Sequence, residues 1–190
     1  MDNYEPKGLA LEIFSKRYAR FEGESFSEAC DRVANHVSAA ESGDGIASHR
    51  AAFVDILKKN LFFPGGRIWY GSGRAKGQLL NCFTVPTADS REGWGRTASD
   101  TIIISGTGGG VGTNYSPVRP RGTTIAGTGG IATGAVSLMR GIDAFGEQMK
   151  AGGGRRTALM MALSLTHGDI IEFLDAKLDL KQLNNANVSV

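Results

Sequence analysis

The chain has 190 residues, of which 21 are basic, 19 acidic and 41% hydrophobic, and its formal net charge is +2. That charge is too small for the basic footprint of a nucleic-acid-binding protein, and the hydrophobic content is too high for a disordered chain. No apolar run approaches the ~20 residues that cross a membrane, and the acidic N-terminus is unlike a signal peptide, so we expect a cytoplasmic protein without membrane or nucleic-acid partners.

The first sixty residues show helical periodicity in three segments. Ser25 and Ser27 are candidate N-caps of the second segment. The tripeptide Pro64-Gly65-Gly66 then breaks the pattern. We therefore predict a helical segment over residues 1–60 and a second domain over residues 61–190.

Strands and helices alternate beyond this break. The sequence predicts strands over residues 78–85, 158–165 and 186–190, and helices over residues 90–105, 131–149 and 169–178. Such alternation is typical of a parallel α/β sheet or barrel. About three strands cannot close a barrel, and the last one runs to the end of the chain. We therefore expect a piece of a larger fold.

Glycine is enriched locally. There are 27 glycines, about twice the usual share, and 15 of them lie between Gly106 and Gly154. Residues 106–112 follow a predicted helix and precede no Gly-Lys-Ser/Thr, so they match neither the dinucleotide-binding fingerprint nor a P-loop. Two interpretations stay open, a nest of backbone N–H groups for an anion or ribose and a flexible turn.

A second glycine-rich segment, residues 152–156, ends in Arg155 and Arg156. Guanidinium groups on a glycine loop can fold around a phosphate or a base, because arginine offers paired donors and a stacking face. The same segment also fits a solvated basic turn at a helix end.

Two cysteines and three histidines exclude a disulfide-rich scaffold and an ordinary zinc site, and we expect no metal ligand in the chain. Cys82 follows Asn81 in an apolar strand and Cys30 lies on a helical apolar stripe, where a cysteine is usually an inert packing residue. His167 fits a helix start better than a general base. The residues by themselves indicate a nucleotide- or phosphate-binding α/β protein.

Seven motifs occur in order along the chain: Phe63-Pro-Gly-Gly-Arg67, Asn81-Cys82-Phe83, the segment from Gly106 to Pro117, Arg119-Pro-Arg-Gly122, Gly152-Gly-Gly-Arg-Arg156, His167-Gly-Asp-Ile170 and Asn185-Ala-Asn-Val-Ser-Val190. Over about residues 60–190 the set resembles the large, catalytic subunit of ribonucleotide reductase. The sequences of the first two motifs are most similar to those of the adenosylcobalamin-dependent class II enzymes. The resemblance implies an α/β protein in which a helical segment precedes the first part of a ten-stranded barrel, incomplete in this chain.

Enzymes of this family replace the 2′-hydroxyl of a ribonucleotide by hydrogen through thiyl-radical chemistry. The resemblance implies that Cys82 is one of two cysteines that form a disulfide as substrate is reduced, with a thioredoxin-like protein as reductant. Asn81, Gly109 and Gly110 match substrate-binding positions. The radical cysteine, the partner of Cys82 and most of the cobalamin site would lie beyond Val190, so we expect the chain alone to be inactive.

Four further residues match the allosteric specificity site of the family. Asp89 matches the acid that binds the ribose of a deoxynucleoside triphosphate effector, and Arg119 opens the first specificity loop. Arg155 and Arg156 belong to the second specificity loop, which contacts effector base or phosphate.

The resemblance also implies a homodimer. The helices predicted over residues 90–105 and 131–149 match those through which two family subunits pack, which makes Leu138, Ile142 and Phe145 candidate interface residues. Either the chain is a fragment, or a second chain supplies the remainder. Two alternatives stay open, a class I large subunit, which takes its radical from a separate small subunit, and a nucleotide-binding regulatory module that has lost catalysis.

Overall fold

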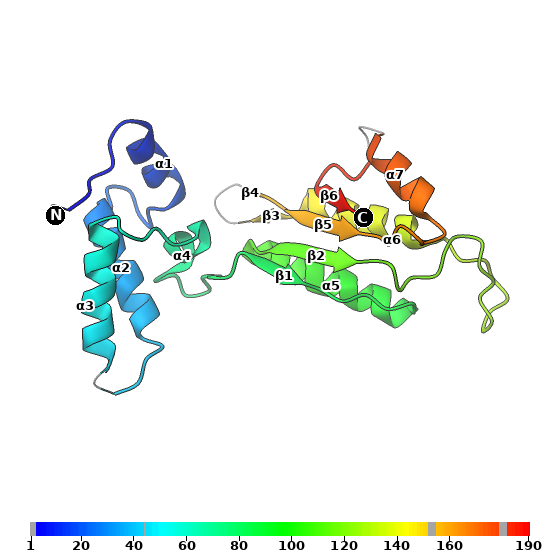
Figure 1. Ribbon diagram of the computed structural model, residues 1–190, viewed down its shortest axis with the longest axis horizontal. Helices are drawn as coiled ribbons and strands as arrows, with labels where there is room; N and C mark the ends of the chain where they lie inside the picture. Colours follow the sequence, from blue (N-terminus) through cyan, green and yellow to red (C-terminus); the bar gives the residue numbers. More distant parts are fainter. Residues whose placement is uncertain (1–2, 44, 152–154, 179–181) are drawn as a thin grey trace. The chain divides into compact units, whose positions relative to one another are not determined.

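The computed structural model of the chain describes residues 3–43, 45–151, 155–178 and 182–190, and for residues 150–151 and 155–156 it describes the backbone alone. The chain divides into two compact units, Met1–Asn81 and Cys82–Val190. Figure 1 shows the elements of each unit. Each unit has a hydrophobic core of its own.

The first unit is helical. Its helices are α1 (Leu9–Arg17), α2 (Phe26–Ser38), α3 (Gly45–Lys58) and α4 (Gly66–Gly71). Ser25 caps α2, because its hydroxyl accepts the Glu28 N–H at 3.2 Å while the Glu28 carboxylate accepts the Ser25 N–H at 2.8 Å. This capping box confirms Ser25 as the N-cap and places Ser27 within the helix.

The core of the first unit lies between α2 and α3 and is closed by α4. Its buried members are Phe14, Phe26, Ala29, Cys30, Val33, Ala34, Leu57 and Trp69. Trp69, on α4, is completely buried. The boundary predicted after residue 60 falls between α3 and α4, whereas the compact unit includes α4 and continues to Asn81.

Arg32, on α2, forms hydrogen bonds to several loops and helix ends of this unit. Its Nε donates to Glu24 at 2.6 Å, and its Nη1 donates to the carbonyls of Trp69 and Ser72, both at 2.9 Å. Its Nη2 donates to the Tyr18 carbonyl at 3.3 Å. One buried guanidinium therefore joins the end of α1, the centre of α2 and the end of α4.

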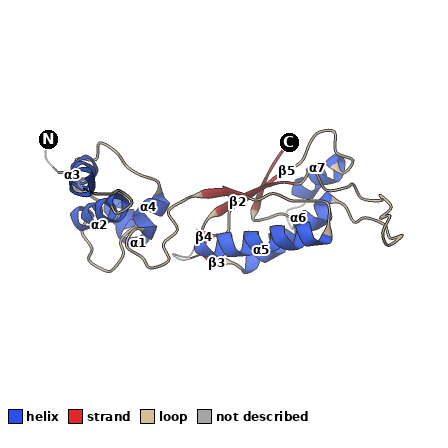
Figure 2. Ribbon diagram, turned by 90° about the horizontal axis from the view of Figure 1, so that it is seen from below, coloured by secondary structure: helices blue, strands red, loops and turns tan. Residues whose placement is uncertain are grey.

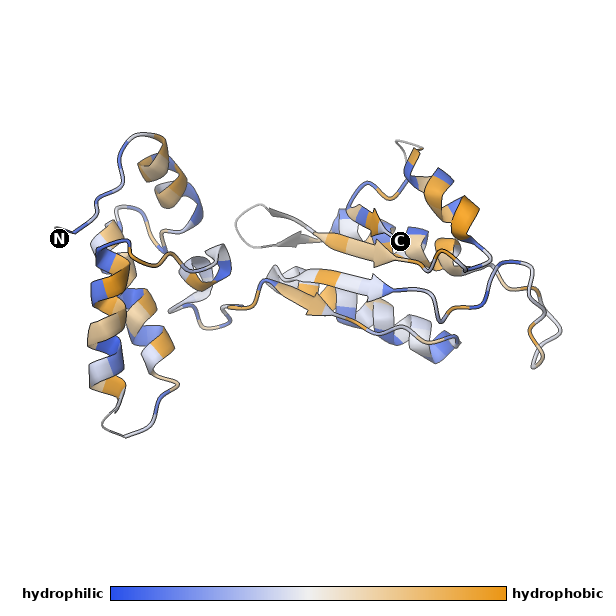
Figure 3. Ribbon diagram, viewed as in Figure 1, coloured by the Kyte–Doolittle hydropathy of each residue, from blue (hydrophilic) through white to orange (hydrophobic). Residues whose placement is uncertain are grey.

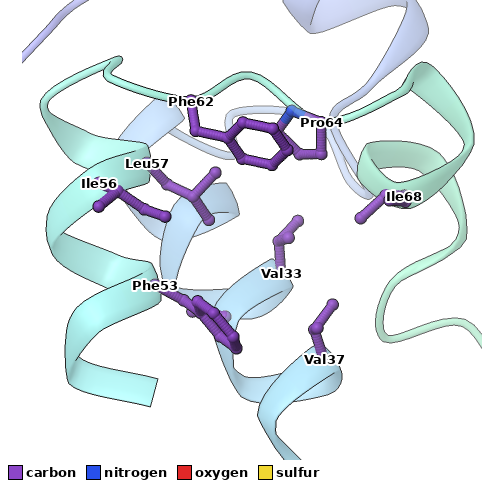
Figure 4. Close-up of a pocket in the computed structure, with 9 residues that line it drawn as sticks. Val33, Val37, Phe53, Ile56, Leu57, Phe62, Pro64 and Ile68 are labelled. Atoms are coloured by element: carbon purple, nitrogen blue, oxygen red, sulfur yellow. The ribbon is translucent and has the colours of Figure 1, made fainter. Parts of the chain in front are cut away.

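An apolar cavity of about 120 Å³ lies beside this core (Figure 4). In Figure 4, Val33 and Val37 of α2 face Phe53 and Leu57 of α3, and Phe62 lies at the upper edge. The lining offers no polar side chain. A phosphorylated ligand would find no partner there, so this cavity is not the nucleotide site that the sequence predicts.

The second unit has a four-stranded parallel sheet in the order β1-β2-β5-β6. The strands are β1 (Cys82–Thr84), β2 (Gly110–Asn114), β5 (Leu159–Ala162) and β6 (Ala186–Ser189), and the short pair β3 (Lys150–Ala151) and β4 (Arg155–Arg156) is antiparallel. Helices α5 (Arg91–Thr107), α6 (Ala135–Gln148) and α7 (Ile170–Leu178) connect the strands. The predicted parallel α/β architecture is confirmed.

The two faces of this sheet differ. Figure 2 shows α5 and α6 on one side of it, and Val111, Leu159 and Ala186, which lie side by side in the register, are buried there. Because side chains alternate along a strand, the next row faces the other way, and its Met160 is 46% exposed. We call this second side, which carries Cys82, Thr84, Met160 and Asn187, the open face. In Figure 3, β5 has the orange of hydrophobic residues, whereas β2 is paler because its glycines have intermediate hydropathy.

The glycine-rich segment over residues 106–112 contains the end of α5 and the start of β2. Gly108 ends α5 in the left-handed region with φ of 89°, and its N–H and that of Gly109 donate to carbonyls of the last turn of α5. From Gly110 onward the chain is β2, in the interior of the sheet. The interpretation as a flexible turn is therefore wrong, and the N–H groups of Gly108 and Gly109 already have acceptors within the chain.

Candidate functional site

Cys82 lies at the start of β1, on the open face. It stands opposite Gly110 in the β1–β2 pairing, and its thiol is free and exposed. The sequence placed Cys82 in a buried strand, so its exposure corrects the interpretation of an inert packing residue. Side chains alternate along a strand, so Cys82 lies on the open face because its neighbour Phe83 lies on the helix-covered face.

Of the predicted substrate-binding residues, the structure brings Gly110 beside Cys82. Gly109 directly precedes it, and a Cβ there would lie 2.7 Å from both Phe83 and Ile104, so packing alone requires a glycine at this position. Asn81 is exposed and covalently adjacent to Cys82, but it is the last residue of the first unit.

Cys30 differs from Cys82 in its surroundings. It is completely buried in the core of the first unit, and burial raises the pKa of its thiol from 9.0 to about 12. It is also free. The prediction that Cys30 is a packing residue is consistent with this burial. Within the described residues, no group of three or more His, Cys, Asp and Glu side chains could hold a metal ion.

Asp89 and Arg119, separated by 30 positions, form an ion pair. Oδ2 of Asp89 accepts from Nε of Arg119 at 2.6 Å, and Oδ1 accepts from the Arg119 backbone N–H at 3.1 Å. The two side chains are 32% and 34% exposed. The structure therefore brings together the two residues that the resemblance placed in an effector site.

The pair lies in a cleft of about 340 Å³ within the second unit. The cleft is lined by Asp89, Ser90, Arg91, Trp94, Arg119, Ile125, Thr128, Ile131, Ala132 and Thr133. One wall is the first turn of α5, where Ser90 is the N-cap and accepts the Gly93 N–H at 2.9 Å. The other wall is the loop that leads from Arg119 to α6.

The chemistry of this cleft suits a ligand with an anionic and an apolar part. Arg91 and Arg119 supply positive charge beside the N-terminus of a 17-residue helix, which itself favours anions. Trp94, Ile125 and Ile131 supply apolar surface a short way from this charge. The carboxylate of Asp89 is an acceptor for a hydroxyl group.

Sequence reasoning missed the apolar lining of this cleft. Ile125 and Ile131 are isolated hydrophobic residues in a glycine- and threonine-rich loop. The helix that the sequence predicts from Ile131 begins only at Ala135 in the structure. Trp94 lies in the polar first half of α5. A large apolar residue in a stretch with no periodicity was the available signal.

The second arginine pair is only partly described. Residues 152–154 lie outside the described residues, and Arg155 and Arg156 are placed as the backbone of β4, paired with β3. Of the predicted interface residues on α6, Leu138 and Ile142 are buried in the core of this unit, whereas Phe145 is 44% exposed. Leu138 and Ile142 are therefore core residues of this unit.

Comparisons with known proteins agree with this architecture. Residues 4–77 match the family description "Ribonucleotide reductase, all-alpha domain", and residues 80–190 match "Ribonucleotide reductase, barrel domain". The chain is 34% identical over 190 residues to the vitamin B12-dependent ribonucleoside-diphosphate reductase of Mycobacterium tuberculosis (strain CDC 1551 / Oshkosh), covering 95% of this chain and 28% of that protein. It is 37% identical over 139 residues to the enzyme of the same name from Thermoplasma acidophilum, covering 73% of this chain and 18% of that one.

Among solved structures, the chain is similar to the Actinobacillus ureae class Id ribonucleotide reductase alpha subunit. The TM-score is 0.82 at 20% identity, over 99% of this chain and 34% of that one, which shows a shared fold. The chain thus spans less than a third of the length of the two curated relatives described above. None of the described helices is long and apolar enough to cross a membrane.

Proposed function

The chain belongs to the family of ribonucleotide reductase large subunits, and from this premise we propose that it forms the amino-terminal part of a catalytic subunit that reduces ribonucleotides to 2′-deoxyribonucleotides. The observation that carries the proposal is the exposed thiol of Cys82 on the open face, directly beside Gly110. A thiol on that face can meet a substrate, whereas one on the helix-covered face could not.

In the proposed reaction Cys82 is one of two thiols that reduce the substrate. Two thiols lose two electrons and two protons and become a disulfide, while the ribose loses its 2′-hydroxyl as water and gains hydrogen. The only other cysteine of the chain, Cys30, is completely buried. The second thiol therefore comes from the remainder of the protein, and a thioredoxin-like dithiol restores the pair.

We assign substrate contacts to Asn81, Gly109 and Gly110. The amide of Asn81, adjacent to Cys82 in the chain, can donate to and accept from ribose hydroxyls. Gly110 leaves the space beside the thiol free of a side chain, which allows a sugar to approach the sheet closely.

A deoxynucleoside triphosphate effector is proposed for the cleft beside Asp89. Its phosphates would meet Arg119, Arg91 and the N-terminus of α5, and its base would lie against Trp94. The Asp89 carboxylate already holds Arg119, and each of its oxygens keeps a second lone pair for a ribose hydroxyl. Arg155 and Arg156 are assigned to the loop that reports effector identity to the substrate.

Adenosylcobalamin is the proposed cofactor because the relatives described above are named vitamin B12-dependent. The described residues contain no cluster that could hold a metal ion, so we assign none of them to cobalt. The cofactor, which supplies the radical when bound, would be held by the remainder of the protein. We also propose a homodimer through α5 and α6. It would bury two hydrophobic side chains that are exposed in the single chain, Phe145 at 44% and Ile103 at 63%.

The test is reconstitution. The chain is co-expressed with the whole part of a B12-dependent relative that follows the matched region, and deoxyribonucleotide formation is measured with adenosylcobalamin and a dithiol. We expect activity in the mixture and none in either part alone. A soluble complex of the two parts without activity would contradict the proposal.

A second function is favoured by the location of the cleft. All of its lining residues lie between Asp89 and Thr133, within a single unit of the chain. A regulatory module that binds nucleotides and has lost catalysis would need nothing more. If this second function is correct, the chain should bind nucleotides and the reconstituted complex should be inactive.

A further inference from the structure

Asp169 holds both ends of the loop that forms one wall of the cleft. It lies between β5 and α7 and is 95% buried, with a relative exposure of 5%. Its Oδ1 accepts the backbone N–H of Arg121 at 2.9 Å, and its Oδ2 accepts that of Ala135 at 2.8 Å. Arg121 follows the cleft residue Arg119 closely, and Ala135 is the first residue of α6.

Between these two points the chain folds back on itself. Thr124 and Ile131 form an antiparallel bridge, and Ile125 donates its N–H to the carbonyl of Gly130 at 2.8 Å. The residues of this hairpin that line the cleft are Ile125, Thr128, Ile131 and Ala132. We call residues 121–135 the wall loop. Its two ends meet at one carboxylate, so that carboxylate fixes where the hairpin stands.

The glycines around Asp169 fit this arrangement. Gly134 has φ of 87°, a conformation that side chains rarely adopt, and a Cβ there would collide with Asp169 and lie 2.8 Å from the Arg121 nitrogen. Gly134 is also the N-cap of α6 and provides no side-chain cap. The Asp169 carboxylate takes that role from a distant part of the chain, with a negative charge at the positive end of the helix.

His167 fixes Asp169 in turn. Its Nδ1 accepts the backbone N–H of Asp169 at 3.0 Å, so its Nε2 carries the proton and donates to the Val118 carbonyl at 2.6 Å. Gly168 between them has no room for a side chain, since a Cβ would lie 2.8 Å from Pro120. The turn 167–169 is thus also hydrogen-bonded to Val118, the residue that precedes Arg119.

We propose that Asp169 is a positioning residue for the nucleotide cleft. It contacts no ligand and acts by holding the wall loop at both ends, so that Ile125 and Ile131 line the same cleft as Trp94 and Arg119 stays beside Asp89. This inference rests on the proposed function of the cleft. It adds that effector affinity depends on a carboxylate outside the cleft lining, at the start of α7.

The test compares Asp169→Asn with wild type and with Asp175→Asn, a change of an exposed acid on α7. The asparagine amide keeps one acceptor but points a donor at the other backbone N–H. Without nucleotide, amide hydrogen exchange should become faster in the wall loop and stay unchanged in β5. The dissociation constants of dATP and dTTP should rise roughly tenfold or more in Asp169→Asn only, as expected for a lost charge-assisted hydrogen bond.

Alkylation of Cys82 provides the local control, because its rate should be the same in all three proteins. Faster exchange throughout the second unit, or an altered Cys82 rate, would reduce Asp169 to a residue of general stability and overturn the inference. Unchanged exchange in the wall loop would overturn it as well. If wild type binds neither nucleotide, the proposed function of the cleft fails, while the exchange of the wall loop still decides whether Asp169 holds it.

A second variant covers the case in which Asp169→Asn does not fold. His167→Ala leaves the carboxylate in place but removes its anchor, so exchange in the wall loop should rise to a smaller extent and nucleotide affinity should fall less. Equal affinity and exchange in His167→Ala and wild type would contradict the proposed chain of contacts.

Discussion

The carboxylate of Asp89 holds Arg119 at two points, through the backbone N–H and through Nε. Asp89 lies just before α5, and Arg119 lies at the start of the segment that leads to α6. Because the two walls of the cleft belong to these two segments, this single ion pair ties the walls together. It also orients the guanidinium, whose terminal amino groups then remain for an anion.

The first prediction concerns nucleotide affinity. Asp89→Ala should weaken the binding of dATP and dTTP by roughly 1–3 kcal/mol, because it removes the hydroxyl acceptor and releases Arg119. Arg119→Ala should weaken it as well and reduce its dependence on salt, since a phosphate contact is lost. The measurement is calorimetric titration, with Asp100→Ala, an exposed acid on α5, as the control. Equal affinity in all four proteins would remove the effector assignment.

The sequence predicted the fold class from the alternation of strands and helices, and it missed β2. That strand contains Gly110 and Gly112, and glycine is unfavourable in strands, so local propensity gave no sign of it. Its place in the sheet comes from tertiary pairing with β1 and β5. The start of α6 was misplaced for a related reason, since its cap is Asp169, which is distant in sequence.

Some site residues could be identified from the sequence, and others depend on the tertiary structure. The resemblance identified Asp89 and Arg119, and the structure places them in contact. Periodicity could not identify Trp94 or Ile125, because their role comes from where two segments meet in space. The exposure of Cys82 could not be predicted either, since a three-residue strand is too short for its pattern to show which side is covered.

The second prediction concerns the buried ion pair of the first unit. The side chains of Arg32 and Glu24 are 9% and 1% exposed. Arg32→Met should lower the free energy of unfolding by about 3–5 kcal/mol, because it leaves the Glu24 carboxylate buried without its partner. In chemical denaturation, the double variant Arg32→Met with Glu24→Gln should lose less than the sum of the two single changes. Additive losses would show that the two side chains do not act as a pair.

The third prediction concerns pH. Hydrogen bonds from the backbone and side chain of Ser25 lower the pKa of Glu28 below its usual 4.5. A carboxyl whose folded pKa is lowered stabilises the protein above its unfolded pKa, and this contribution is lost as the pH falls through the folded value. Glu28→Gln should therefore lower the melting temperature at pH 7 more than at pH 3, because it removes the charge that both Ser25 donors stabilise. The same decrease at both values would contradict a role for the charged form of Glu28.

The last prediction concerns the two thiols. Burial raises the pKa of Cys30 to about 12, so its reactive thiolate is roughly a thousandfold scarcer than at the usual 9.0, and its side chain is also inaccessible. Cys82 is exposed. A thiol reagent should therefore modify one cysteine in the native chain and two in the denatured chain, and Cys82→Ser should abolish the native reaction. In the reconstituted enzyme Cys82→Ser should also abolish multiple turnover with a dithiol, because the redox pair can no longer form, whereas Cys30→Ser should retain it. Full turnover in Cys82→Ser would make Cys82 a mere surface residue of the sheet and would leave the nucleotide cleft as the only functional site proposed for the chain.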